Sequence, residues 1–312
     1  MSAVVSVIIP CYNSATFLRE AIDCVLGQTY LAREVIVVDD GSTDSSAAIM
    51  DSYNEQIRVV RQPNAGLPAA RNAGIKMARG QYFAFLDADD YWDPGFLEKM
   101  IGALALHHAD IAYCGWQNVG LPGGRGQPFV PPDYEAAADK MEVFFAHPRW
   151  PVHAAVVSKA VIGATDGFDP KWKSCEDFAF WIRVAPKYKL VCVPEVLAFY
   201  RFHGEQMTAN RSRMALSHLA VQDEYLRDTP EVEIRLGAGK VRELMYGRLL
   251  NKGFEAYWSR DLDAARDIFK VVMRAGYGKP KDWLYMLPAW LPSAFHRAML
   301  GFRDNRAQGK GK

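Results

Sequence analysis

The chain has 312 residues, 50% of them hydrophobic, so it can bury a sizeable core in one large domain or two smaller ones. Its 37 basic and 36 acidic residues leave a formal net charge of +1. Nucleic-acid-binding proteins usually carry a clear basic excess or a basic stripe. We therefore expect no nucleic-acid partner.

The first third of the chain alternates between apolar strands and amphipathic helices. The run Val4–Ile9 is β-branched and nearly continuous, as in a strand buried on both faces. Similar patterns predict, in chain order, a helix at 15–27, a strand at 34–38, a helix from Ser42 to about Tyr53, a strand at 57–61, a helix at 68–78 and a strand at 82–86. This alternation predicts an α/β fold with a mainly parallel sheet flanked by helices.

Polar residues follow three of these predicted strands. They are Cys11-Tyr12-Asn13, Asp39-Asp40 and Asp87-Ala88-Asp89. Ligands of such sheets bind beyond the carboxyl ends of the strands. We therefore expect these three segments to meet at one edge of the sheet.

Beyond about residue 102 the pattern is weaker. The Gly- and Pro-rich stretch 120–133 predicts a loop, and 152–157 and 190–193 are candidate strands around a short helix at 176–183. After His203 the sequence predicts helices at 214–227, 241–259 and 262–275. The domain boundaries that we expect are 1–105, 106–208 and 209–312.

The pair Asp87 and Asp89 can bind one divalent cation. Two carboxylates at positions i and i+2 after a strand can turn toward the same ion, and oxygen ligands beside a diphosphate suit Mg²⁺ or Mn²⁺. A solvated acidic turn is the alternative, because such turns after strands are common.

The adjacent acids Asp39 and Asp40 allow a second interpretation of the same kind. A carboxylate at this strand end can accept the imide N–H of a uracil ring, which would select the base. The alternative is a turn that caps the following helix, to which Ser42 and Asp44 also contribute.

The acids Glu176 and Asp177 lie among aromatic residues, from Trp172 to Trp181. Burial raises the pKa of a carboxyl group, which suits a general base held near an acceptor hydroxyl. The alternative is an acidic pair that stabilises the N-terminus of the following helix.

Together these motifs resemble glycosyltransferase family 2, which has the GT-A fold. The resemblance runs from Val5 to about Thr208. It rests on the segments Val5–Asn13, Glu34–Asp44, Asn64–Asn72, Phe85–Asp90, Glu176–Asp177 and Tyr200–His203, in this order. It implies an α/β GT-A (Rossmann-like) sheet, with 1–105 as the nucleotide-sugar-binding half, 106–208 as the acceptor-binding half and 209–312 as a helical extension.

The resemblance also implies roles for individual residues. Tyr12 would lie against the base and Asp40 would read its edge, while Asp177 matches the catalytic base. Asp89 and His203 would bind Mn²⁺ or Mg²⁺, and Arg201 and His203 match a segment that closes over the diphosphate. The complete donor-binding set is Pro10, Tyr12, Asn13, Asp39, Asp40, Arg71, Asp87 and Arg201.

The resemblance implies an inverting, non-processive enzyme that moves one sugar from a nucleotide-sugar, a UDP-sugar in the first place, to a glycan or lipid-linked acceptor during cell-surface glycan or polysaccharide synthesis. Two alternatives stay open. A nucleotidyltransferase would share the sheet and the acids but normally has a Gly-rich phosphate loop where this chain has Cys11–Ser14. A non-catalytic nucleotide- or glycan-binding scaffold could dispense with the acids.

The sequence also bears on location. The five cysteines are widely spaced, odd in number and without a CxxC pair, which indicates a reducing compartment. No signal peptide or membrane span is recognisable, so we expect a cytoplasmic protein. The segment 283–312 begins with apolar and aromatic residues and ends with basic ones, and it predicts a peripheral contact with an anionic membrane surface. Packing of its aromatics on the protein core is the alternative.

Overall fold

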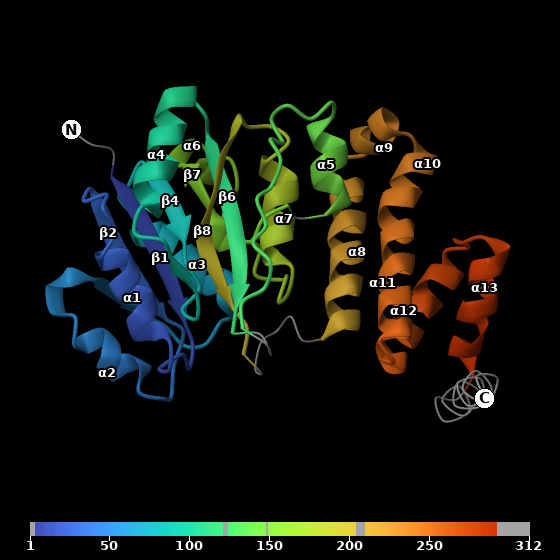
Figure 1. Cartoon of the computed structure of the whole chain (residues 1–312), viewed down its shortest axis with the longest axis horizontal. Coiled ribbons are helices and arrows are strands. Elements are labelled where there is room, and N and C mark those ends of the chain that lie inside the picture. Colours follow the sequence, from blue (N-terminus) through green and yellow to red (C-terminus); the bar gives the residue numbers. More distant parts are fainter. Residues whose placement is uncertain (1–3, 121–123, 148, 204–209, 292–312) are drawn as a thin grey trace. The chain divides into compact units, whose positions relative to one another are not determined.

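The computed structural model describes residues 4–120, 124–147, 149–203 and 210–291. The chain divides into two compact units, Met1–Gln206 (unit 1) and Met207–Lys312 (unit 2), each with its own apolar core (Figure 1). Within the described ranges, every helix is too short or too polar to span a bilayer.

Unit 1 is built on an eight-stranded sheet with the order β3-β2-β1-β4-β7-β6-β8-β5. The strands are β1 (Val5–Cys11), β2 (Arg33–Asp39), β3 (Arg58–Arg61), β4 (Tyr82–Phe85), β5 (Tyr91–Trp92), β6 (Ile111–Val119), β7 (Ala155–Ser158) and β8 (Leu190–Arg201). The first four strands pair in parallel, as do β6 and β8. Strand β7 is antiparallel to β4 and β6, and β5 is antiparallel to β8. The prediction of a mainly parallel α/β sheet is confirmed.

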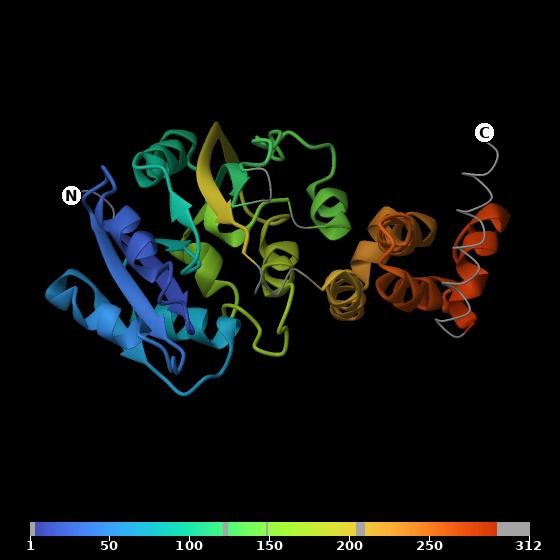
Figure 2. The ribbon, with the colours of Figure 1, turned by 60° about the horizontal axis from the view of Figure 1, so that its bottom comes forward.

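Helices flank this sheet on both faces, as the two views in Figures 1 and 2 show. They are α1 (Leu18–Leu26), α2 (Ser46–Asp51), η1 (Asn54–Gln56), α3 (Leu67–Met77), α4 (Phe96–His107), α5 (Lys140–Ala146), η2 (Val152–Ala154), α6 (Lys159–Gly163) and α7 (Glu176–Val184).

Apolar burial fixes the position of β1 at the centre of the parallel strands. All seven of its residues are buried, which is why its sequence is apolar except for Ser6 rather than alternating. Helix α3 packs directly on it at Gly74, where a Cβ atom would lie 2.4 Å from Ile8 Cγ2. This close approach sets the distance of α3 from the sheet, and with it the position of Arg71.

The order of the strands creates a binding position at the ends of β1 and β4. From β1 the chain moves to β2 and β3 on one side and then returns to β4 on the other side. Such a reversal leaves a crevice at the carboxyl ends of the strands, where ligands of open α/β sheets bind. The residues after β1, β2 and β4 are those that the sequence singled out.

The later part of unit 1 contains elements that the sequence pattern did not predict. Strand β6 and helix α4 were missed, and β8 extends to Arg201 instead of ending near Val193. Strand β6 contains Gly115 and polar residues, and its register with β8 shifts at Gly115. Both features interrupt the hydrophobic period from which strands are predicted.

Unit 2 is helical, and α8, α11 and α12 pack against one another (Figure 1). Its elements are α8 (Arg211–Asp228), α9 (Glu231–Leu236), α10 (Ala238–Arg242), η4 (Glu243–Gly247), α11 (Arg248–Trp258), α12 (Leu262–Arg274), α13 (Pro280–Met286) and η5 (Leu287–Trp290). The three predicted helices are present, but the one predicted at 241–259 is interrupted by a π-helical turn, η4.

Candidate active site

The loop after β1 leaves one large aromatic side chain available to a ligand. Tyr12 is 50% exposed, whereas Pro10 is buried inside the strand. Asn13 has a left-handed backbone with φ of 49°, and its Oδ1 accepts a hydrogen bond from the backbone N–H of Thr43 at 2.7 Å. Asn13 therefore ties the β1 loop to the β2 loop and thereby orients Tyr12.

The two acids after β2 have different partners. The Asp40 carboxylate is buried and accepts hydrogen bonds from Gln62 Nε2 at 2.7 Å and from the backbone N–H groups of Ala65 and Gly66 at 2.9 and 2.8 Å. Asp39 Oδ1 accepts from the Ser42 N–H at 2.9 Å, and the described residues provide no hydrogen bond to its Oδ2. Both acids are buried, but Asp40 is fully engaged in holding the loop before α3, whereas Asp39 has one oxygen to which the described residues donate no hydrogen bond.

Arg71 joins the end of β4 to the start of α7. Its Nη2 lies 2.7 Å from Asp87 Oδ1 and its Nη1 lies 2.7 Å from Glu176 Oε1, while its side chain is 1% exposed. Burial by itself lowers the pKa of Arg71, but the two carboxylates outweigh burial and raise this pKa above its ordinary value. The guanidinium is therefore permanently charged and brings two acids together that are far apart in the sequence.

Asp177 lies next to this bridge, in the first turn of α7. Its side chain is partly exposed, and its Oδ1 accepts a hydrogen bond from the Phe178 N–H at 2.7 Å. Burial, and then the charge of Glu176, raise the pKa of Asp177, while Arg71 opposes the shift. A carboxylate with a raised pKa and access to solvent can accept a proton from a hydroxyl group.

Asp89 and His203 form a second, more exposed pair. The distance from Asp89 Oδ2 to His203 Nε2 is 2.9 Å, and the side chains are 29% and 27% exposed. Arg201 supports the pair, because its Nε donates to the Asp89 carbonyl at 2.9 Å and its Nη2 lies 2.8 Å from Glu20 Oε2. The segment after β8 is thus fastened to the loop after β4.

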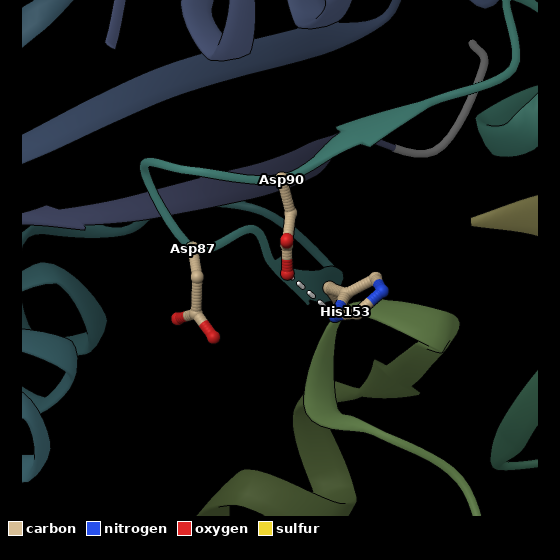
Figure 3. A group of neighbouring side chains, drawn as sticks. All are labelled: Asp87, Asp90 and His153. Carbon is tan, nitrogen blue, oxygen red and sulfur yellow. Dashed lines mark ion pairs between the residues drawn. The ribbon is translucent and has the colours of Figure 1, made fainter. Parts of the chain in front are cut away.

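A buried acid–histidine pair also involves the acidic motif after β4, and no pattern in the sequence predicted it. Asp90 Oδ2 lies 3.0 Å from His153 Nδ1, neither side chain has exposed surface, and Figure 3 shows Asp90 pointing toward His153. Asp90 Oδ1 accepts a hydrogen bond from the Arg201 N–H at 2.8 Å. Burial raises the pKa of Asp90 and lowers that of His153 to about 4, so both shifts favour the uncharged forms.

Two groups of side chains offer ligands to a divalent cation. Ligand atoms of Asp87, Asp90 and His153 lie within 4.8 Å of one another, but two of these side chains are completely buried. Mg²⁺-like ions keep several waters or phosphate oxygens, which such a position excludes. Asp89 and His203 are more exposed, and a cation could bind there only by replacing the direct 2.9 Å contact between Asp89 Oδ2 and His203 Nε2.

The chain is similar to glycosyltransferases in sequence and in fold. The model of glycosyl transferase family 2 matches residues 6–155. An uncharacterized glycosyltransferase of Rickettsia typhi is 30% identical over 249 residues, which are 78% of this chain and 78% of the relative.

Solved structures share the fold at lower identity. S. aureus TarS 1–349 in complex with UDP-GlcNAc has a TM-score of 0.63 at 20% identity, over 91% of this chain and 81% of that chain. The mannosyltransferase PcManGT from Pyrobaculum calidifontis, in complex with GDP-Man and Mn²⁺, has a TM-score of 0.59 at 20% identity, over 96% and 83%. The predicted GT-A architecture is confirmed. The family match and the relatives confirm the predicted glycosyltransferase rather than the nucleotidyltransferase or scaffold alternatives. This chain belongs to glycosyltransferase family 2.

Proposed function

We propose that this glycosyltransferase moves one sugar from a nucleotide-sugar, preferably a UDP-sugar, to an acceptor hydroxyl with inversion at the anomeric carbon. The observation that carries the proposal is the double ion pair of Arg71 with Asp87 and Glu176. It joins the donor end of the sheet, at β4, to the start of α7, where Asp177 lies. The bridge thus holds the proposed base and the proposed donor site, far apart in sequence, within one site.

In the proposed reaction Asp177 accepts the proton of the acceptor hydroxyl. The acceptor oxygen forms a bond to the anomeric carbon as the bond from that carbon to the diphosphate oxygen breaks. The nucleoside diphosphate leaves with the electron pair, and attack from the opposite face inverts the configuration. The raised pKa of Asp177 makes its carboxylate a stronger base than an ordinary aspartate.

Asp89 and His203, with Asp87 beside them, are the residues that would hold Mn²⁺ or Mg²⁺. A cation bound there would neutralise charge on the leaving diphosphate. Arg201, fastened to Asp89 and Asp90, is placed to keep the segment after β8 closed over the diphosphate. The Mn²⁺-bound mannosyltransferase with the same fold supports this assignment.

On the donor side, we assign the base-reading role to Asp39 rather than to Asp40. The Asp40 carboxylate already accepts three hydrogen bonds from the loop before α3. Asp39 Oδ2 is the carboxylate oxygen that a uracil imide could use, and the exposed Tyr12, which follows the Cys11 that pairs with Asp39, could stack on the ring. Residues 1–105 would then form the nucleotide-sugar half and 106–208 the acceptor half.

A donor-hydrolysis assay tests the proposal. The full chain is incubated with UDP-, GDP- and dTDP-sugars, with and without Mn²⁺ or Mg²⁺, and release of the nucleoside diphosphate and the anomeric form of the sugar are followed. We expect metal-dependent release from a UDP-sugar with inverted product. Release of pyrophosphate, or retention of configuration, would contradict the proposal.

We also propose that unit 2 contacts an anionic membrane surface, on which a lipid-linked acceptor would lie. Leu284, Leu287 and Trp290 are 72%, 52% and 51% exposed, and Lys270 and Arg274 lie over the Trp290 ring at 5.7 and 5.6 Å from its centroid. Exposed aromatics beside cations favour the headgroup region. The five cysteines are free, which fits the cytoplasmic face. The basic residues Arg297, Arg303, Arg306, Lys310 and Lys312 lie outside the described residues.

Co-sedimentation with anionic liposomes tests this contact. The triple variant Leu284→Ser, Leu287→Ser, Trp290→Ser should sediment less than the native chain. Ile234→Ser, which removes an exposed apolar side chain from α9, is the matched control and should sediment normally. Equal, salt-insensitive sedimentation of native chain and triple variant would rule the contact out.

A further inference from the structure

Unit 2 contains a cavity of about 400 Å³ between α8 and α11. Pockets for small ligands typically measure about 300–1,000 Å³, so this one has the size of a binding site. The lining residues are Arg211, Met214, Ala215, His218, Leu219, Gln222, Met245, Arg248, Leu249, Lys252 and Glu255.

The lining follows from helical periodicity and one irregular turn. The α8 residues lie three or four positions apart, from Arg211 to Gln222, and so occupy one face of that helix. The π-helical turn η4 contributes Met245 and leads directly into Arg248, the first residue of α11. Single π-helical turns occur frequently at functional sites. Here the turn places one apolar and one cationic side chain in the same cavity.

The cavity combines an apolar floor with a positive charge. Met214, Ala215, Leu219, Met245 and Leu249 supply the apolar surface. The cations Arg211, Arg248 and Lys252 line it with a single carboxylate among its described lining residues, that of Glu255.

That carboxylate is engaged by one of these cations. Glu255 Oε2 lies 2.6 Å from Lys252 Nζ, so among the described lining residues three cations share one carboxylate. Burial lowers the pKa of Arg248 to about 10, and Glu255 opposes the shift. Arg248 is thus charged at neutral pH but poorly solvated. A bound anion would stabilise its charge in place of the missing water.

We propose that the groove between α8 and α11 binds an anionic amphiphile, with one phosphate or carboxylate at Arg248 and Lys252 and an aliphatic chain on Met214, Leu219 and Leu249. The ligand class follows from the pairing of cations with an apolar floor in one cavity. Neutral amphiphiles would form no ion pair with these cations, and small inorganic anions would not cover the apolar floor. The proposal does not depend on the active site or on the glycosyl transfer proposed above.

Calorimetric titration of the full chain with four probes tests this proposal. Dodecyl phosphate and dodecanoate carry the two headgroups, dodecyl maltoside is uncharged and inorganic phosphate has no chain. All amphiphiles are used below their micelle-forming concentrations. We expect at least one of the two anionic amphiphiles to bind 1:1, at least tenfold more tightly than the maltoside and than phosphate. The tighter of the two identifies the headgroup.

Three variants locate the binding. Arg248→Gln should lower the affinity for the anionic amphiphile at least tenfold. Lys252→Gln, a change at an exposed position that should leave folding intact, should lower it at least threefold. Arg227→Gln is the matched control, because Arg227 lies on α8 outside the cavity and pairs only at the surface with Asp223. Its affinity should stay within twofold, and thermal melting verifies that each variant is folded.

Three outcomes would overturn the proposal. They are equal binding of dodecyl maltoside, native affinity in both folded cavity variants, and no binding of either anionic amphiphile at 1 mM, a concentration well above that expected for a built site. Because the readout is binding rather than sugar transfer, such a result would leave the proposed reaction intact.

Discussion

The charged groups at the carboxyl edge of the sheet form two regions that differ in access to solvent. The buried bridge consists of Arg71 and Glu176, which are 1% and 9% exposed, together with Asp87, which is 24% exposed and lies at the edge of the bridge. The surface pair consists of Asp89 and His203, which are 29% and 27% exposed. Both regions join an acid to a basic side chain at hydrogen-bond distance, but the surface pair is the one that can exchange its partner for a ligand at little cost.

This difference in exposure suggests different roles, a structural one for the buried bridge and a ligand-binding one for the surface pair. A buried charge is costly without its partner, so the buried bridge has to persist through the catalytic cycle. An exposed ion pair contributes little to stability and can open when a cation or a diphosphate arrives. Asp177 lies at the boundary, next to Glu176 in sequence but partly exposed. Three predictions test this division.

The largest effect should follow from Asp177→Asn, which keeps the shape of the side chain and removes the base. We expect donor affinity to stay near the native value and kcat to fall by roughly 10²–10⁴-fold, the usual range for loss of a general base. Asp169→Asn, at another partly exposed aspartate of unit 1, serves as the control and should keep kcat. A loss below tenfold would move the base elsewhere, with Glu176 the first candidate.

Arg71→Met should cause the largest loss of stability. Removal of the guanidinium leaves Glu176 buried without its partner, and breaking a buried pair in this way costs about 3–5 kcal/mol. Arg58→Met, which breaks the more exposed pair with Glu34, should cost less than about 1 kcal/mol. Urea unfolding of both variants measures the difference. Similar losses in the two variants would remove the distinction between buried bridge and surface pair.

The smallest effect concerns the stability of Asp177→Asn as a function of pH. Burial raises the folded-state pKa of Asp177 above its unfolded value, so ionisation favours the unfolded state. This penalty is absent below the unfolded pKa of about 3.9 and grows as pH rises through the folded pKa. The Asn variant should therefore be more stable than the native chain at pH 8, and the difference should be smaller at pH 5. A larger difference at pH 5 would contradict the raised pKa.

The sequence predicts the donor side of the fold better than the acceptor side, for physical reasons. Strand β1 is fully buried and β2 and β4 are mostly buried and apolar, and the residues that follow these strands are polar and mark the proposed binding edge. Strand β6 is interrupted by Gly115, and β8 contains Pro194 and Glu195 in its middle, so neither shows a strand period over its whole length. These segments are recognisable as strands only from their pairing with each other in the folded sheet.

The sequence indicates candidate residues for the site but not which of them pair with one another. Asp39 and Asp40 are adjacent and alike in sequence, and only the loop before α3 distinguishes the engaged carboxylate from the available one. Arg71 and Glu176 are separated by 105 positions, so no local pattern connects them. Asp90 follows the acidic motif and could have been chosen with it, whereas nothing near His153 in the sequence indicates its role.

The central claim is that the surface pair binds a cation that assists the donor diphosphate. Calorimetry of UDP binding with and without Mn²⁺, in the native chain and in Asp89→Ala, tests it most directly. Asp51→Ala, which removes an exposed ion-pair partner of Arg61, is the control. We expect Mn²⁺ to strengthen UDP binding in the native chain and the control, and to have no effect in a folded Asp89→Ala variant. Undiminished, metal-enhanced binding in Asp89→Ala would contradict the claim.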